Sequence, residues 1–248
     1  MSSNYRMQVQ YDGSRYNGWQ KQGDTDNTIQ NKLETILSRM TGEQVEVHGA
    51  GRTDAGVHAK GQIAQFRLME DRDPEEICDY LNTYLPEDIG VTSVSYAAPR
   101  FHSRYNASSK TYLYRIAKKK EAHVFDRKYV YLYKGGALDT AAMKTATIQL
   151  LGEHDFRSFC GNPRMRKSTV RTIYAIRITE TEDEIDIAFT GSGFLQYMVR
   201  ILTGSLIEVG EGRRDPLSMD ALLLARDRRM AGPTAPACGL TLMEVRYN

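Results

Sequence analysis

The sequence of 248 residues holds few cysteines and none in a metal-binding spacing. Its three cysteines, Cys78, Cys160 and Cys238, are odd in number and far apart, which excludes the paired framework of a small disulfide-rich secreted domain. No stretch approaches the roughly 18 consecutive apolar residues of a transmembrane helix, and the N-terminus lacks the basic and apolar parts of a signal peptide. These absences predict a cytoplasmic protein that makes no contact with a membrane.

An excess of one charge is also absent, because 33 Lys and Arg against 31 Asp and Glu give a net charge of +2 at pH 7. A surface for a polyanion therefore needs local segregation of charge. Nucleotide-binding loops are absent as well, since Gly191-Ser192-Gly193 lacks the lysine of a P-loop and the third glycine of the dinucleotide fingerprint. The sequence thus predicts neither ATP nor NAD as a cofactor, and the histidine spacings predict no metal site.

What the sequence does contain is the composition of a globular protein, with 41% hydrophobic and 26% charged residues. Apolar positions at helical spacing and capping residues predict helices that begin at residues 28, 73, 139, 194 and 219. The predicted strands are 6–11, 45–48, 63–68, 89–96, 111–117, 172–179, 185–189 and 240–247. Two successive β-α-β-β-α-β patterns predict an α+β fold of two ferredoxin-like halves with largely antiparallel sheets, residues 1–102 and 103–248.

Two segments concentrate positive charge. Residues 100–120 carry seven Lys or Arg, four aromatic residues and no acid, and residues 157–171 carry five more cations and again no acid. Acids gather instead in residues 70–79 and 180–186, which predicts one basic face. Either basic segment alone is equally consistent with an ordinary solvated surface, but together they favour nucleic-acid binding. The candidate contacts to a phosphate backbone are Arg104, Lys110, Arg164 and Arg166.

A glycine-rich string lies between two predicted strands: Gly49-Ala50-Gly51-Arg52-Thr53-Asp54-Ala55-Gly56-Val57-His58-Ala59. Its three glycines permit tight turns or close contact with a ligand. If residues 52–54 are extended, Arg52 and Asp54 project to the same side, and the cation keeps the carboxylate ionised. An ionised carboxylate suits a nucleophile or a base. The alternative is an Asx turn or a structural ion pair, since Asp beside glycine is common in turns.

Two further positions are candidates to face a ligand. Tyr112 and Tyr114 alternate in a predicted strand, so both rings lie on one face, where core packing is the ordinary expectation. Arg200 lies in a predicted helix on a polar stripe with Gln196 and Thr203, opposite an apolar side. A solvated arginine is the ordinary alternative there.

Several short motifs are together highly specific. They are Tyr11-Asp12-Gly13, Gly18-Trp19-Gln20, Gly51-Arg52-Thr53-Asp54-Ala55-Gly56-Val57-His58-Ala59, Leu85-Pro86-Glu87-Asp88-Ile89, Phe101-His102-Ser103-Arg104, Lys110-Thr111-Tyr112, Gly152-Glu153-His154-Asp155-Phe156, Gly191-Ser192-Gly193-Phe194-Leu195, Met198-Val199-Arg200 and Ala231-Gly232-Pro233-Thr234-Ala235-Pro236. On these motifs the sequence resembles, from end to end, the tRNA pseudouridine synthase A family, which isomerises uridines in the anticodon stem-loop of tRNA.

The resemblance implies the pseudouridine synthase fold and an activity on tRNA positions 38, 39 and 40 that needs no cofactor and no metal. It implies that Asp54 is the catalytic aspartate, that Tyr112 stacks on the target base and that Arg200 pairs with the aspartate. Arg52 is implied to help hold the flipped nucleotide. The family is homodimeric, with each tRNA spanning both subunits, and the resemblance implies the same here. Ser103 stands where the family often has alanine, a departure that concerns specificity.

Two other functions use the same residues. A non-catalytic RNA-binding module is opposed by the intact Asp54, Tyr112 and Arg200. A hydrolase of the N-glycosidic bond would use Asp54 as a nucleophile, but a clear second catalytic carboxylate is absent. For the isomerisation itself three routes stay open, because an ionised Asp54 can add to C6 of uracil, attack C1′ of the ribose or remove the 2′ proton.

Overall fold

The structure, a computed structural model, describes residues 2–248, which form two compact units. The first unit contains residues 2–108 and Thr241–Asn248, and the second contains Ser109–Leu240. Whether the predicted halves, 1–102 and 103–248, are units of folding stays a prediction. Across the described residues, no helix has both the length and the apolar character needed to cross a membrane.

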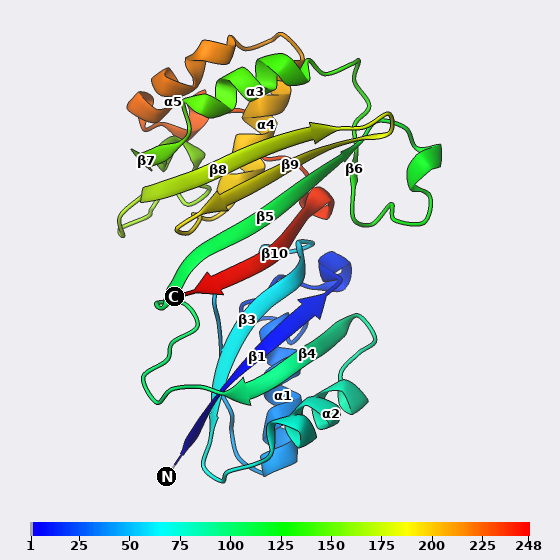
Figure 1. Cartoon of the computed structure of the whole chain (residues 1–248), viewed down its shortest axis with the longest axis vertical. Coiled ribbons are helices and arrows are strands. Elements are labelled where there is room, and N and C mark those ends of the chain that lie inside the picture. The colour runs from blue at the N-terminus through cyan, green and yellow to red at the C-terminus, as the bar shows by residue number, and fades with distance from the viewer. Residues whose placement is uncertain (1) are drawn as a thin grey trace. The chain divides into compact units, whose positions relative to one another are not determined.

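The first unit is a mainly antiparallel sheet with two helices on one face (Figure 1). Its elements are β1 (Ser3–Tyr11), α1 (Ile29–Thr41), β2 (Val47–Gly49), β3 (His58–Leu68), α2 (Pro74–Tyr84), β4 (Ile89–Tyr96) and β10 (Leu240–Tyr247). The strands follow the order β4-β1-β3, β2 pairs antiparallel with β3, and β10 pairs with β3 in parallel. The order β4-β1-β3-β2 is that of a ferredoxin-like unit.

Both helices of this unit begin at the capping residues that the sequence indicates. Thr28 Oγ1 accepts a hydrogen bond from the N–H of Asn31 at 3.3 Å, and Asp73 Oδ1 accepts one from the N–H of Glu75 at 2.7 Å. These bonds satisfy N–H groups that the first turn of a helix leaves open. α1 then ends at Gly42, whose left-handed φ of 77° suits glycine. The helix starts predicted near residues 28 and 73 are confirmed.

The second unit repeats the combination of an antiparallel sheet and helices. Its elements are β5 (Ala107–Ala117), β6 (Tyr131–Leu132), α3 (Thr140–Ile148), β7 (Gly152–Asp155), β8 (Val170–Glu180), β9 (Glu184–Gly191), α4 (Met198–Gly210) and α5 (Met219–Ala225). The strands follow the order β5-β9-β8-β7, and β6 pairs with β5 in parallel. The predicted α+β class with largely antiparallel sheets is confirmed.

β3 is longer than the sequence predicts. It begins at His58, and its added residues include Gly61, which weakens a strand pattern read from sequence alone. A Cβ at Gly61 would lie 2.3 Å from the carbonyl oxygen of Met243 in β10. The glycine therefore permits the close approach of two strands and does not end one.

The helix that contains Arg200 begins later than the sequence predicts. α4 starts at Met198, because Tyr197 adopts a left-handed conformation with a φ of 61° that does not continue a right-handed helix. Eleven of the 13 residues of α4 are buried, and Thr203 is among them. The predicted polar stripe of Gln196, Arg200 and Thr203 was wrong, since Gln196 precedes the helix and the Thr203 hydroxyl donates to a carbonyl four residues earlier.

Candidate active site

Asp54 lies in the loop that joins β2 to β3, and it is half-buried. The adjacent Thr53 is buried, and its Oγ1 forms a 2.8 Å hydrogen bond with the hydroxyl of Tyr11 at the end of β1. Burial raises the pKa of Tyr11 to about 12, so this hydroxyl keeps its proton at neutral pH. The loop is thereby attached to an inner strand of the sheet next to the candidate carboxylate.

A tight turn at Gly18 supports the backbone of the same loop. The N–H of Trp19 donates to the carbonyl of Thr53 at 3.0 Å, and the carbonyl of Gly18 accepts from the N–H of Ile29 at 3.2 Å. Gly18 has a φ of 91°, and a Cβ there would lie 2.7 Å from the carbonyl oxygen of Thr53. Only glycine combines this φ with so close an approach, so Gly18 fixes the Asp54 loop to the start of α1.

His58 holds the other end of the loop. It begins β3, is 2% exposed, and accepts a hydrogen bond at Nδ1 from the N–H of Gly13 at 3.0 Å. The same Nδ1 lies 3.3 Å from Asp12 Oδ1. An Nδ1 that accepts from a backbone N–H leaves the proton of a neutral imidazole on Nε2. His58 therefore ties the turn at residues 12–13 to the strand that follows Asp54.

Tyr112 lies in β5, opposite Phe189 of β9, and is 7% exposed. The ring of Phe194 meets it edge to face, with centroids 5.3 Å apart and an interplanar angle of 85°. Tyr114 is fully buried, and its hydroxyl donates to the carbonyl of Pro236 at 2.8 Å. Tyr114 is thus a core tyrosine, whereas Tyr112 lies nearer to the Gly191 end of the β5-β9 pair.

Arg200 lies in the first turn of α4 and is half-buried. Its Nε donates to the carbonyl of Ala235 at 2.7 Å, and the N–H of Ala235 donates to the carbonyl of Arg200 at 3.1 Å. The guanidinium carbon lies 5.2 Å from the centre of the Tyr197 ring. These contacts orient the guanidinium, which a solvated arginine on a helix surface would not require.

Residues 231–236, which position Arg200, were found in the sequence as a motif, but their contact with α4 was not predicted. Residues 231–236 pack against α4 at Gly204, where a Cβ would lie 1.8 Å from the carbonyl oxygen of Pro233. Next to it, the N–H of Gly232 donates to Ser205 Oγ at 2.9 Å. The signal in the sequence was the pair of small residues, Gly204 and Ser205, inside an apolar helix, because a missing side chain lets another backbone approach.

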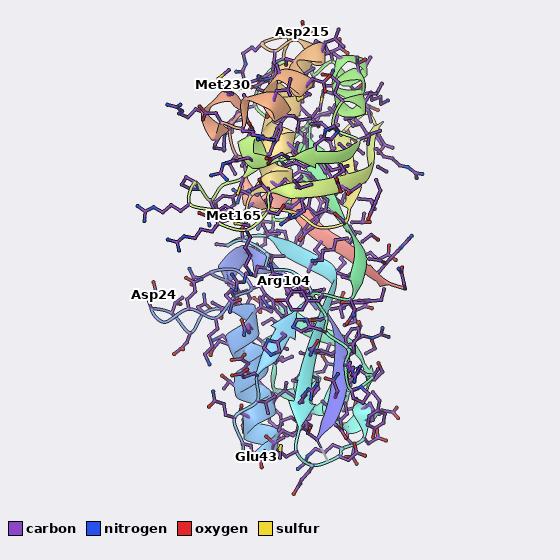
Figure 2. All side chains as sticks on the ribbon, turned by 90° about the vertical axis from the view of Figure 1, so that its left-hand side faces the viewer. Asp24, Glu43, Arg104, Met165, Asp215 and Met230 are labelled. Atoms are coloured by element: carbon purple, nitrogen blue, oxygen red, sulfur yellow. The ribbon has the colours of Figure 1, made fainter. Side chains whose placement is uncertain are left out.

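The candidate cations are distributed over both units. In the first, Arg52 and Arg104 are exposed and line one hollow. In the second, Arg164 and Arg166 are exposed in the segment before β8, and Lys110 is half-buried in β5. Figure 2 shows Arg104 together with the loop of Asp24, which projects from the first unit. The structure thus brings two predicted cations of the first unit to one surface.

Part of the predicted basic face was wrong. Because β5 and β9 pair antiparallel, the cations at the end of β5 lie beside the acids of residues 180–186. The close pairs are Arg115 with Glu184 at 2.6 Å, Lys118 with Glu180 at 2.9 Å, and Lys119 with Glu182 at 2.6 Å. The cations and the acids are more than 60 residues apart in the sequence, but the register of β5 with β9 brings them together, and their charges offset each other.

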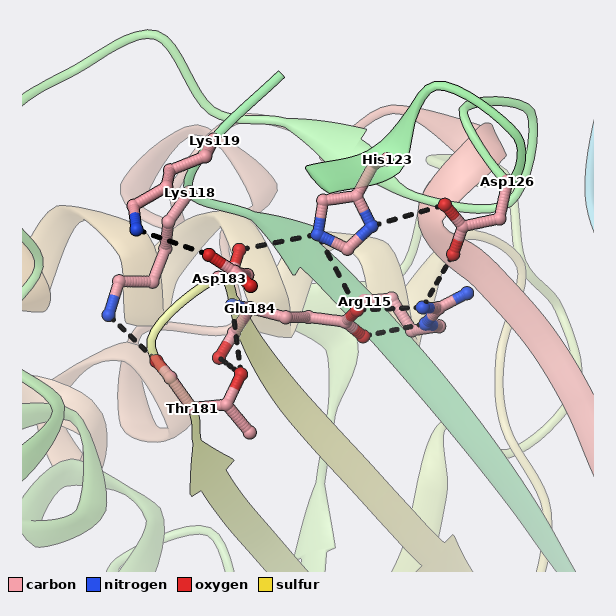
Figure 3. Close-up of polar contacts among 8 residues, drawn as sticks. All are labelled: Arg115, Lys118, Lys119, His123, Asp126, Thr181, Asp183 and Glu184. Carbon is pink, nitrogen blue, oxygen red and sulfur yellow. Dashed lines mark hydrogen bonds and ion pairs between the residues drawn. The ribbon is translucent and has the colours of Figure 1, made fainter. Parts of the chain in front are cut away.

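One group among residues 2–248 has the donors for a metal ion. His123, Asp126 and Glu184 offer ligand atoms that lie within 4.8 Å of one another. Arg115 donates to both acids, through Nη2 to Asp126 Oδ2 at 2.8 Å and through Nε to Glu184 Oε1 at 2.6 Å (Figure 3). With a guanidinium bound to both carboxylates, the group is an ion network that joins β5, β9 and the loop after β5.

Comparison with known proteins gives one consistent result. A family model described as "tRNA pseudouridine synthase" matches residues 7–106 and 146–248. A "tRNA pseudouridine synthase A" from Bacillus sp. (strain KSM-64) is 46% identical over 246 residues, which cover 99% of this chain and 100% of the relative. A "tRNA pseudouridine synthase A 1" from Clostridium tetani is 46% identical over 244 residues, covering 98% and 99%. A "tRNA pseudouridine synthase A 2" from Bacillus cereus (strain ZK / E33L) is 42% identical over 245 residues, covering 99% and 100%.

Proposed function

The chain belongs to the tRNA pseudouridine synthase family and is an isomerase that acts on tRNA, and from this premise we propose that it converts uridines 38, 39 and 40 of the anticodon stem-loop to pseudouridine in the cytoplasm. One observation carries the proposal. The string that contains Asp54 is a loop held on three sides, by Tyr11, by Gly18 and by His58. Such support suits a carboxylate that must meet a substrate atom in a fixed position.

The proposed reaction starts with the target uridine leaving the base stack, since no side chain reaches its glycosidic bond inside a stem. Stacking of the base on Tyr112, worth about 1–3 kcal/mol, offsets part of the unstacking cost. Arg52 helps to hold the flipped nucleotide, and Lys110, Arg164 and Arg166 contact phosphates.

Asp54 acts in its ionised form, and Arg200 favours that form electrostatically. The bond between N1 of uracil and C1′ of ribose breaks, the uracil turns, and a bond forms between C5 and C1′. C5 then loses its proton and N1 gains one, so the product is an isomer of the substrate. The steps proposed for this chain transfer no electron and consume no nucleotide.

The role of Asp54 in bond cleavage has three forms, which are addition to C6, attack on C1′ and removal of the 2′ proton. A tRNA that contains 5-fluorouridine separates the addition route from the glycal route, because fluorine in place of the C5 hydrogen blocks the final deprotonation. A rearranged product that remains attached to Asp54 would indicate addition, whereas a product with inverted configuration at C2′ would indicate the glycal route.

The main test is release of tritium from C5-labelled uridine in unmodified tRNA, without added metal or nucleotide. We expect release with the wild-type protein and none with Asp54→Asn, which keeps the side-chain volume and removes the charge. Asp24→Asn is the matched control, since Asp24 is an exposed aspartate on a loop of the same unit (Figure 2). Equal release by the wild type and Asp54→Asn would remove Asp54 from the mechanism.

The same assay separates the two other functions. Binding of tRNA with no release by the wild type would indicate a non-catalytic RNA-binding module. Free uracil in the supernatant would indicate hydrolysis of the glycosidic bond instead of isomerisation.

We also propose that the protein is a homodimer in which each tRNA contacts both subunits. Light scattering at micromolar concentration measures the mass directly. A monomer there, with full activity, would refute this part of the proposal and leave the chemistry untouched.

A further inference from the structure

A hollow beside the Asp54 loop shares one residue, Arg52, with the proposed chemistry, and its other residues have no part in it. It has a volume of about 690 Å³, and Gly51 and Arg52 of the loop form part of its wall. The rest of the wall comes from residues 19–23, from α1, from residues 44–49 and from residues 102–105, all within the first unit. Its volume lies in the range of pockets that bind small ligands, and a single nucleotide has a fitting size.

Three rings form a row along this wall. The centroids of His48 and His102 are 5.9 Å apart with planes at 23°, and those of His102 and Tyr105 are 4.3 Å apart with planes at 43°. Burial, and then the charges of His48 and Arg104, lowers the pKa of His102, so the middle ring is neutral at pH 7. Tyr105 is 73% exposed, so most of its ring is open to a ligand.

The turn that carries Tyr105 is held in place from beneath. Ser103 is fully buried, its N–H donates to Gln65 Oε1 at 2.5 Å, and its hydroxyl donates to the carbonyl of His48 at 2.6 Å. The hydroxyl of Tyr247 donates to the carbonyl of Ser103 at 2.7 Å. The exposed ring therefore stands on a fixed backbone, which lowers the entropic cost of binding.

The charges around the hollow favour an anionic ligand. Lys21 is balanced by the buried Glu34, with 3.1 Å between Nζ and Oε2. Glu46 is the other acid at the wall, and its side chain is 73% exposed. For residues 2–248, neither Arg52 nor Arg104 takes part in an ion pair, so two guanidinium groups are available to a phosphate.

We propose that this hollow is a second nucleotide subsite, which binds the nucleotide next to the reacting uridine with its base on Tyr105 and its phosphate at Arg104. The inference rests on the proposed function, because it takes the ligand to be the strand that is modified. Rings and arginines on one wall match a single-stranded nucleotide, whose base is free to stack. The subsite adds affinity and does not touch the reacting base.

The first experiment compares the wild type with Tyr105→Ala, Tyr105→Phe and the control Tyr84→Ala, a partly exposed tyrosine at the end of α2 that does not line the hollow. We expect Tyr105→Ala to raise the Kd for unmodified tRNA and the KM about tenfold, the order of one base–aromatic stack, with kcat unchanged. Tyr105→Phe and Tyr84→Ala should bind as the wild type does. A melting curve checks that each variant is folded.

A second experiment removes the base instead of the ring. The probe is the same tRNA with an abasic residue on either side of the modified uridine. One of the two abasic tRNAs should bind the wild type about tenfold more weakly than intact tRNA, and Tyr105→Ala should bind both alike. Arg104→Gln should lower the salt dependence of binding by about one phosphate contact.

The outcomes separate the subsite from the proposed function. If the wild type forms no pseudouridine, the proposed function fails. If the wild type is active and Tyr105→Ala binds intact tRNA as tightly as the wild type, the subsite is refuted. A Tyr105→Ala variant that loses affinity equally for intact and abasic tRNA would also refute base stacking at this position.

Discussion

Arg200 and Ala235 lie 35 positions apart and hold each other by two hydrogen bonds. One runs from Nε of the arginine to the alanine carbonyl, and the other from the alanine N–H to the arginine carbonyl. The side-chain bond uses a nitrogen for which lysine has no counterpart. Replacing Arg200 with lysine keeps the positive charge and removes the hydrogen bond that orients the side chain. The substitution therefore tests orientation separately from charge.

We expect Arg200→Lys to lower the rate of pseudouridine formation at saturating tRNA by roughly tenfold or more. A hydrogen bond from a charged group is worth about 1.5–3 kcal/mol, and 1.4 kcal/mol corresponds to a factor of ten. A single-turnover assay measures the rate, with the largely exposed Arg213→Lys as the control. A wild-type rate in Arg200→Lys would show that charge alone suffices.

Gly204→Ala should destabilise the second unit. Its Cβ would lie 1.8 Å from the carbonyl oxygen of Pro233, so one backbone must shift. Overpacking of this kind costs about 1–3 kcal/mol, and each kcal/mol lowers the melting temperature by roughly 2–4 °C at this size. Gly136→Ala is the control, because a Cβ at Gly136 would meet no atom within 4 Å. Equal melting temperatures for the two variants would contradict the close packing.

Gly18→Ala should reduce activity as well as stability. The new Cβ meets the carbonyl of Thr53, which shifts the Asp54 loop, and the positive φ adds strain of about 1–2 kcal/mol. Gly42 also has a positive φ, 77°, but a Cβ there would meet no atom within 4 Å. Gly42→Ala therefore tests the backbone strain without the collision. We expect both variants to melt earlier and only Gly18→Ala to lose turnover. Full turnover in Gly18→Ala would separate this turn from the catalytic loop.

The pKa of Asp186 predicts how the stability of the protein depends on pH. Burial, and then the neighbouring Glu184 carboxylate, raises the pKa of Asp186 to about 7, and its Oδ1 is buried without a hydrogen-bond partner among the described residues. In the unfolded chain this carboxyl loses its proton near its ordinary pKa of about 3.9. The folded state therefore binds more protons between those values, and this group's contribution to stability falls as the pH rises from about 4 to 7.

Asp186→Asn removes that pH dependence, because the amide stays neutral. We expect the melting temperature of the variant, relative to the wild type, to be higher at pH 8 than at pH 4. Thermal melting at both pH values in the same ionic strength tests it. A difference that is the same at the two pH values would mean that folding does not raise the pKa of Asp186.

The fold was largely predictable because its signals are local. The caps at Thr28 and Asp73 and the apolar spacing of α1 act within a few residues. The start of α4 was missed, because the left-handed conformation of Tyr197 is not favoured by its own residue type. The start of β3 was also missed, since the predicted strand began at residue 63, and the contact that explains Gly61 is with a carbonyl of β10, far away in the sequence.

The candidate site was predictable as a set of residues and not as a set of contacts. Asp54, Tyr112 and Arg200 were found from motifs, and their proposed roles still await a test. The support of Arg200 by Ala235 was not found, because a hydrogen bond to a backbone carbonyl leaves no trace in residue type. The two basic segments were counted correctly, but strand register, which a single sequence does not specify, decided which cations are paired.

The pairing of β5 with β9 has a consequence for how salt affects RNA binding. Counterions are released only where a cation of the protein replaces them on a phosphate, and each such contact steepens the fall of affinity with ionic strength. Arg115, Lys118 and Lys119 already face carboxylates, so they have little charge left to exchange with the ion atmosphere of an RNA. The salt dependence of tRNA binding should therefore be shallower than the 12 cations of the two basic segments would suggest.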